Sequence, residues 1–90
     1  MDQEIRNYME ICVEDALMPI LKTLDVCTCE RCRCDIMAIA LNALPPKYVV
    51  TPRGHLFSKI DTLRQQNDVD LISAITKGAT IVSRMPRHDD

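Results

Sequence analysis

Apolar residues recur every three or four positions along the first quarter of the chain. This spacing places them on one face of an amphipathic helix, which we predict over residues 3–17 with Asp2 as its N-cap. Pro19 lacks an amide hydrogen and crowds the turn before it. We therefore expect a kink or break near Leu17, followed by a short helical piece that ends at Leu24.

A second helix is predicted over residues 30–43, where apolar side chains leave few positions for solvent. We expect this helix to be central and the most buried. It ends before Pro45 and Pro46, because a proline disfavours the helical conformation of the preceding residue. Residues 47–51 are predicted to form either a short strand or a polyproline-like segment, and residues 52–54 a turn.

The helical period returns near residue 56 and continues to about residue 84, with one irregularity at Asn67. Two interpretations fit this pattern: one long helix over residues 58–84, or two helices with a break at Asn67 and Asp68. Pro86 then prevents further extension of the helix. The whole pattern predicts an all-α, single-domain helical fold over residues 1–90.

The composition supports packed helices. Nearly half of the 90 residues are hydrophobic, but only two tyrosines and one phenylalanine are aromatic, so the core must be aliphatic. A chain of this size buries only roughly 60–65% of the surface that its unfolded form exposes. Its own core is therefore marginal, and a homodimer would help to close it.

Several classes of protein are excluded by composition. The apolar runs are far shorter than the roughly 20 residues that span a bilayer, and the acidic start does not resemble a signal peptide. We therefore expect a cytoplasmic protein with reduced thiols and no membrane partner. A net charge of −2 opposes nucleic-acid binding. With only Gly54 and Gly78, the chain has no glycine-rich phosphate loop.

The densest chemistry is a group of four cysteines just before and inside the start of the second predicted helix: Cys27, Cys29, Cys32 and Cys34. Unpaired amides at a helix start and the neighbouring arginines favour thiolates, which are the ligands that zinc prefers. The Cys29-x-x-Cys32 spacing is that of a zinc knuckle. The sequence therefore predicts a structural Zn²⁺ site at these four cysteines. Buried apolar thiols or a redox dithiol are the alternatives.

The fourth ligand is left open. Two residues along a helix, Cys34 points roughly 200° away from Cys32, so both bind one ion only if the helix starts later. The other candidates are Cys12, Asp35, His55, His88 and a residue of a second subunit. Cys12 lies on an apolar helix face, which is more typical of a core residue. No histidine or carboxylate is arranged as a general base beside the cluster, so we do not predict an enzyme.

Residues 27–49 carry a more specific pattern. The run Cys27-x-Cys29-x-x-Cys32-x-x-Asp35-Ile36, followed by Ala38-x-Ala40-Leu41-Asn42-x-Leu44-Pro45-Pro46-Lys47-Tyr48-Val49, resembles the late competence development protein ComFB family. The resemblance implies an all-helical, zinc-binding homodimer without enzymatic activity. Members of that family are implicated as receptors for cyclic dinucleotides, chiefly cyclic di-GMP and in some cases cyclic di-AMP. Cys34 departs from the family pattern, which requires only the three earlier cysteines.

A cyclic dinucleotide needs basic groups for its phosphates and flat groups that stack on its bases. Between residues 22 and 64 the chain has seven basic residues and four acidic ones. Lys47, Tyr48 and Arg53 lie in the predicted non-helical connection, where binding residues are common. They are the candidate ligand contacts, although a solvated basic face and a core or interface tyrosine would also explain them.

The preferred hypothesis is a zinc-binding homodimeric regulatory protein that binds a cyclic dinucleotide, cyclic di-GMP first, and passes the signal to a protein partner. The alternative is a competence-associated structural or interaction protein with purely structural zinc and no nucleotide ligand. A thiol-based redox or metal sensor is a third hypothesis, which rests on the additional Cys34.

Overall fold

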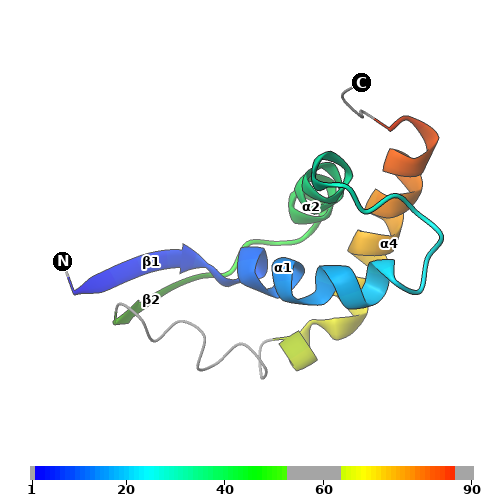
Figure 1. Ribbon diagram of the computed structural model, residues 1–90. Helices are drawn as coiled ribbons and strands as arrows, with labels where there is room; N and C mark the ends of the chain where they lie inside the picture. The colour runs from blue at the N-terminus through cyan, green and yellow to red at the C-terminus, as the bar shows by residue number, and fades with distance from the viewer. Residues whose placement is uncertain (1, 53–63, 87–90) are drawn as a thin grey trace.

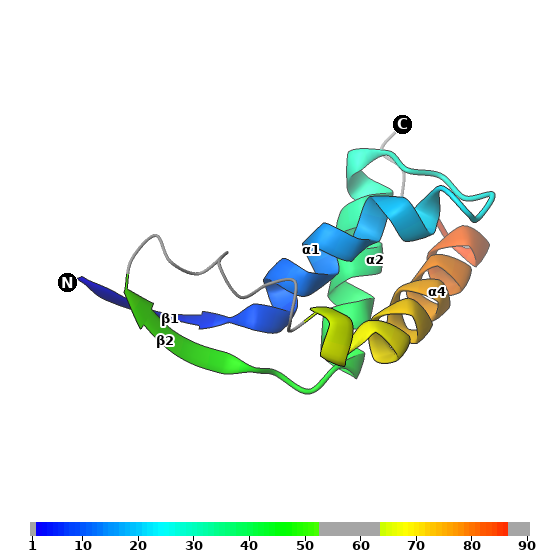
Figure 2. The ribbon, with the colours of Figure 1, turned by 90° about the horizontal axis from the view of Figure 1, so that it is seen from below.

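The structure is a computed structural model that describes residues 2–52 and 64–86. In chain order its elements are β1 (Gln3–Asn7), α1 (Tyr8–Leu21), α2 (Glu30–Ala43), β2 (Tyr48–Pro52) and α4 (Asp68–Arg84). The three long helices pack together, and the two strands form a ribbon that extends away from them (Figure 1). The view at right angles shows the same separation between the ribbon and the helices (Figure 2).

The two strands correct the expectation of an all-α fold. β1 pairs antiparallel with β2, with Ile5 opposite Val50 and Asn7 opposite Tyr48. A helix from residue 3 with Asp2 as its cap was therefore a wrong prediction. Ile5 has helical spacing to the apolar residues that follow, but pairing with β2 determines its conformation instead. Of the two interpretations of residues 47–51, the strand is confirmed.

α1 begins where β1 ends, at Asn7. The Asn7 Oδ1 atom accepts hydrogen bonds from the Met9 amide at 3.1 Å and from the Lys47 amide at 2.9 Å. The Tyr8 amide donates to the Lys47 carbonyl at 2.8 Å. Asn7 thus caps the helix and, at the same time, fixes the start of β2 against it.

Of the kink or break predicted at Pro19, the break does not occur, since α1 continues through the proline to Leu21. Only two helical residues follow the proline, so little of the helix depends on the hydrogen bond that it cannot make. Leu17 and Leu21, on either side of it, are both buried in the core. Their burial offsets the local cost of the proline, at about 1.5–3 kcal/mol for each fully buried side chain.

The aliphatic core lies between α1, α2 and α4, and α1 contributes the most to it. The expectation that the second helix is the most buried is wrong, because only Cys32, Ile36 and Ala40 of α2 are buried. Its other large apolar residues pack only partly against the core. α2 approaches α4 closely at Gly78, where an added Cβ atom would lie 3.0 Å from the Ile36 carbonyl oxygen.

Of the two interpretations of the last helical region, the break is confirmed. Residues 64–66 are helical, Asn67 forms a turn, and α4 starts at Asp68. α4 ends at Arg84, two residues before Pro86, as predicted. The predicted turn lies partly outside the described residues, because these stop at Pro52 and resume at residue 64. Within the described ranges, no helix combines the length and the apolar character needed to cross a membrane.

Candidate metal centre

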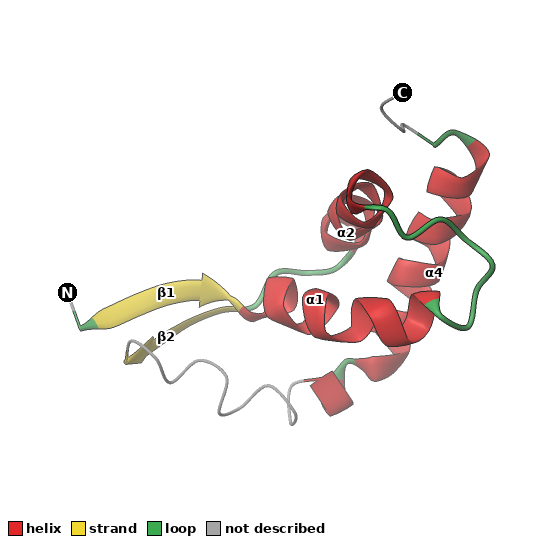
Figure 3. Cartoon of the chain, in the orientation of Figure 1, coloured by secondary structure: helices red, strands yellow, loops and turns green. Residues whose placement is uncertain are grey.

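Three thiols converge at the start of α2. Cys27 and Cys29 lie on the loop that joins α1 to α2, and Cys32 lies in the first turn of α2. This loop is drawn in green between the two helices in Figure 3. The sulfur atoms of these three residues all lie within 4.8 Å of one another. We refer to them as the thiol cluster.

The local fold explains why the thiols meet. Cys29 is the N-cap of α2, and its Sγ atom accepts a hydrogen bond from the Cys32 amide at 3.4 Å. The Arg33 amide donates to the Cys29 carbonyl at 2.9 Å, which closes the first helical turn. A sulfur atom in the capping position necessarily faces the first turn, so the Cys-x-x-Cys spacing places both sulfurs at the same end of the helix.

The residues of the thiol cluster differ in how far they are exposed to solvent. Cys27 is exposed, whereas Cys32 is 1% exposed. Burial, together with hydrogen bonds to Cys29 and Cys27 and the charge of those two thiols, raises the pKa of the Cys32 thiol to about 12. Burial therefore outweighs the helix terminus and the arginines, which were expected to lower thiol pKa values here. A metal ion bound at this site must displace the Cys32 proton.

The arrangement fits a tetrahedral metal ion with soft ligands. Zinc–sulfur bonds of about 2.3 Å in a tetrahedral site place the sulfurs roughly 3.8 Å apart. The separations within the thiol cluster need only a small adjustment to reach that value. Cys27, Cys29 and Cys32 are therefore positioned to bind a metal ion, and the donor set is compatible with zinc.

Among the described residues, the other predicted ligands are not part of this group. Cys34 is exposed on α2, and Cys12 is buried in the core. Burial raises the pKa of Cys12, the Asp15 carboxylate adds to that rise, and Arg64 opposes it. Asp35 also lies outside the cluster in the described part of the chain, and His55 and His88 are not among the described residues. The identity of a fourth ligand stays a prediction.

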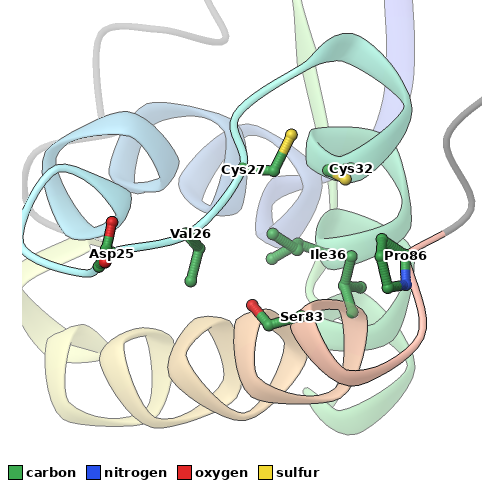
Figure 4. Close-up of a pocket in the computed structure, with 8 residues that line it drawn as sticks. Asp25, Val26, Cys27, Cys32, Ile36, Ser83 and Pro86 are labelled. Carbon is green, nitrogen blue, oxygen red and sulfur yellow. The ribbon is translucent and has the colours of Figure 1, made fainter.

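A cavity of about 270 Å³ adjoins the thiol cluster. Cys27 and Cys32 line one side of it, and Ser83 and Pro86 come from α4 and the segment after it (Figure 4). Ile36, one turn along α2 from Cys32, lies between these groups. The cavity therefore connects the thiol cluster with the end of the described chain.

The family of this chain is decided by a match along almost its whole length. The family model described as late competence development protein ComFB matches residues 6–86. The chain belongs to the ComFB family. It is 27% identical over 81 residues to the competence protein ComFB of Bacillus subtilis strain 168, covering 89% of this chain and 83% of that protein.

A solved structure supports the same relationship. The fold is similar to that of the late competence protein ComFB from Bacillus subtilis, with a TM-score of 0.74 and 28% sequence identity. The match covers 92% of this chain and 94% of that one. The resemblance inferred from residues 27–49 is therefore confirmed.

Two of the three candidate ligand contacts, Lys47 and Tyr48, lie where β2 begins. Lys47 is held through its backbone and leaves its side chain exposed, and Tyr48 is 68% exposed. Arg53 lies outside the described residues. Lys47 and Tyr48 are therefore consecutive residues at the start of β2, and both are exposed.

The sequence analysis missed one feature of this ribbon. Ile5, Tyr48 and Val50 lie on the same face of the two-stranded sheet, and each is 63% exposed or more. We refer to them as the ribbon face. The signal that could have revealed it is a period of two in β2, where Val49 and Thr51 are covered and the residues between them are exposed.

Proposed function

We propose that this ComFB-family protein is a zinc-stabilised, homodimeric regulatory protein of late competence that acts in the cytoplasm without catalysing a reaction. The observation that carries the proposal is the thiol cluster. Three sulfurs from a loop and a helix start lie within 4.8 Å of one another. When bound there, zinc supplies a fixed crosslink between ligands that are otherwise held only by the polypeptide.

The zinc is proposed to be structural. Cys27 and Cys29 belong to the loop after α1, and Cys32 belongs to α2 and is buried in the core. Ligation of all three joins a segment without regular structure to the helix that packs on α4. Because a site of this kind does not pre-exist in the unfolded chain, its binding free energy contributes to folding.

Cys32→Ser tests the zinc assignment. We expect the wild-type protein to retain zinc on purification, and we expect this variant to lose it and to unfold at a lower temperature, since one of three clustered ligands is removed. Metal content by mass spectrometry and melting by circular dichroism measure both effects. Cys12→Ala is the matched control: this core residue lies outside the cluster, so the variant should lose stability but keep its zinc. Full zinc occupancy in Cys32→Ser would contradict the proposal.

The homodimer is proposed from the ribbon face. A two-stranded sheet is marginal in water unless another surface covers it, and Ile5, Tyr48 and Val50 are exposed on this one. A second copy with the same face would bury Ile5 and Val50 through a twofold interface and leave Tyr48 at its edge. That arrangement would also place two copies of Lys47 and Tyr48, one from each subunit, near the edge of the dimer interface.

We further propose that a cyclic dinucleotide binds at Lys47, Tyr48 and Arg53, with cyclic di-GMP as the first candidate and cyclic di-AMP as the second. The exposed Tyr48 ring offers a stacking surface for a base, and the adjacent Lys47 ammonium group suits a phosphate. A dimer with twofold symmetry would present two Lys47 and two Tyr48 side chains to the ligand, which itself has approximate twofold symmetry. Binding of the ligand would then be signalled to a protein partner that interacts with the dimer.

Isothermal titration calorimetry of the zinc-loaded protein with cyclic di-GMP tests this ligand, with cyclic di-AMP and GTP as comparisons. We expect saturable binding of one or two ligands per dimer, which Tyr48→Ala should weaken. Val69→Ala is a control at another exposed position, on α4. Absence of heat with every nucleotide would exclude the ligand and favour the alternative, a competence-associated interaction protein whose zinc is purely structural.

A further inference from the structure

A second cavity lies at the far end of α2 from the thiol cluster, where this end packs beside the first half of α4 (Figure 2). The cavity has a volume of about 260 Å³. It is lined by Ala43, Leu44, Pro45, Asp70, Ser73, Ala74 and Lys77. The length of α2 separates it from the thiol cluster by roughly 20 Å, and its lining residues are distinct from those of the zinc site and the ribbon face. We refer to it as the α2–α4 cavity.

The wall formed by α4 carries two opposite charges. Residues 70, 73, 74 and 77 have the spacing that places side chains along one face of a helix. Helical side chains lean toward the N-terminus of the helix, so the long Lys77 side chain extends back toward Ser73 and Asp70. Neither Asp70 nor Lys77 forms an ion pair with another residue of the described ranges, 2–52 and 64–86. A carboxylate and an ammonium group can therefore both meet a ligand here.

The wall formed by the end of α2 adds carbonyl groups that have no donor within the helix. The carbonyl of a helical residue normally accepts from the amide four positions later. For Leu41 and Asn42 those positions hold the two prolines that follow the helix, which have no amide hydrogen. For Ala43 it is Lys47, whose amide donates to Asn7 Oδ1 at 2.9 Å instead. This end of α2 therefore carries partial negative charge and attracts a cationic group.

We propose that the α2–α4 cavity binds a small zwitterion, a free α-amino acid with an aliphatic side chain. The ligand ammonium group lies between the Asp70 carboxylate and the carbonyl groups at the end of α2. The ligand carboxylate accepts hydrogen bonds from Lys77 and from the Ser73 hydroxyl. Both contacts with charged side chains are charge-assisted, which is the stronger class of hydrogen bond. The aliphatic side chain of the ligand packs on Leu44 and Pro45, which are apolar parts of the wall.

Size and lining select this class of ligand. At about 30 Å³ of liquid volume for each water, the cavity holds roughly nine non-hydrogen atoms, about the size of leucine. A wholly apolar ligand would desolvate Asp70 and Lys77 without a partner, which is costly for a charged group. A ligand with a single charge would satisfy only one of them. The inference uses neither zinc nor a nucleotide, so it goes beyond the function proposed above.

Isothermal titration calorimetry of the full-length protein with L-leucine tests the site, with L-valine and L-isoleucine as further probes. We expect saturable binding to one site per chain. Leucinamide has no carboxylate, and 4-methylpentanoate has no ammonium group. Each should bind at least about tenfold more weakly than leucine, because it lacks one charge-assisted contact. No saturable heat with any of the three amino acids would overturn the inference, and so would equal affinities for leucine and its two analogues.

Variants without one charge identify the residues. Lys77→Gln should weaken leucine binding at least about tenfold and abolish the preference for leucine over leucinamide. Asp70→Asn should weaken it similarly and abolish the preference over 4-methylpentanoate. Asp68→Asn is the matched control with wild-type affinity, since Asp68 also lies in the first turn of α4 but outside the cavity wall. Circular dichroism verifies that each variant is folded. An equal loss in Asp68→Asn and Asp70→Asn, or unchanged preferences in both cavity variants, would contradict the assignment.

Discussion

At the scale of single residues, Asn7 connects parts of the chain that are forty positions apart. Its side-chain oxygen accepts from the Met9 amide within α1 and from the Lys47 amide at the start of β2. One acceptor thus satisfies a free amide of the helix start and fixes the ribbon to the helices. The neighbouring Tyr8 is buried and packs with Ile11 against Val49, which strengthens the same junction.

Asn7→Ala should therefore lower the free energy of unfolding by about 1–2 kcal/mol, the upper part of the range for a lost N-cap, because two hydrogen bonds disappear together. Thermal melting followed by circular dichroism measures the loss. Asn7→Asp is the control, since it keeps an oxygen acceptor and should remain close to the wild-type stability. Equal melting temperatures for the alanine and wild-type proteins would show that this junction is not a source of stability.

The cysteines show that one residue type serves different purposes. Cys12 is an apolar core residue whose pKa is raised by burial. Cys29 acts as a helix cap through its sulfur atom, and Cys32 is both buried and part of the thiol cluster. Cys34 is exposed to solvent. Spacing identified the cluster, but exposure and contacts distinguish these roles.

At the scale of elements, the packing of α2 on α4 determines where Cys32 lies. The two helices approach at Gly78, with the Ile36 carbonyl oxygen 3.0 Å from where a Cβ atom would be. Ile36 is one turn from Cys32 on the same helix and lines the cavity beside it. A change in the distance between α2 and α4 at Gly78 would therefore displace Cys32, the thiol-cluster residue that belongs to α2.

Gly78→Ala should destabilise the protein. Alanine improves helix propensity by about 1 kcal/mol, but overpacking costs typically 1–3 kcal/mol, and the opposing atom is backbone that cannot rotate away. We expect a net loss of about 1 kcal/mol and weaker zinc retention, measured by denaturant unfolding and by metal content. Ser73→Ala, at an exposed site on α4, should change stability by less than about 0.5 kcal/mol. A Gly78→Ala protein more stable than wild type would show that α2 moves aside freely.

At the scale of the whole molecule, the ribbon extends away from the packed helices (Figure 1). The molecule measures 42 × 28 × 20 Å, and its long extent reflects the ribbon that leaves the three helices (Figure 2). Ile5, Tyr48 and Val50 expose apolar surface on one face of it. A second copy that covers this face would remove the apolar surface from water.

Val50→Glu is expected to dissociate the proposed dimer, because it places a charge opposite its own symmetry copy in an apolar interface. Size-exclusion chromatography with light scattering measures the mass over a range of concentrations. Val69→Glu is the matched control, since Val69 is 79% exposed on α4 and away from the ribbon. A dimer that persists in Val50→Glu but dissociates in Val69→Glu would move the interface to α4.

Much of the fold could be predicted from local pattern. The second helix has the predicted bounds, residues 30–43, because its start follows a capping cysteine and its end precedes two prolines. The break at Asn67 and the end before Pro86 were also available from the sequence. Three of the four cysteines predicted as metal ligands form the thiol cluster, since the Cys-x-x-Cys spacing brings Cys29 and Cys32 together at the helix start, whereas Cys34 lies outside it.

What the sequence by itself determined is thus the set of features that depend on neighbours three or four residues away: helix periods, caps, proline limits and the local thiol pair. The tertiary structure decided the conformation of residues 3–7, whose partner strand lies more than forty positions along the chain. It also decided which helix is most buried and that Pro19 stays within α1. These outcomes depend on contacts between distant segments, and local propensity is too weak to set them when strand pairing or core burial favours another conformation.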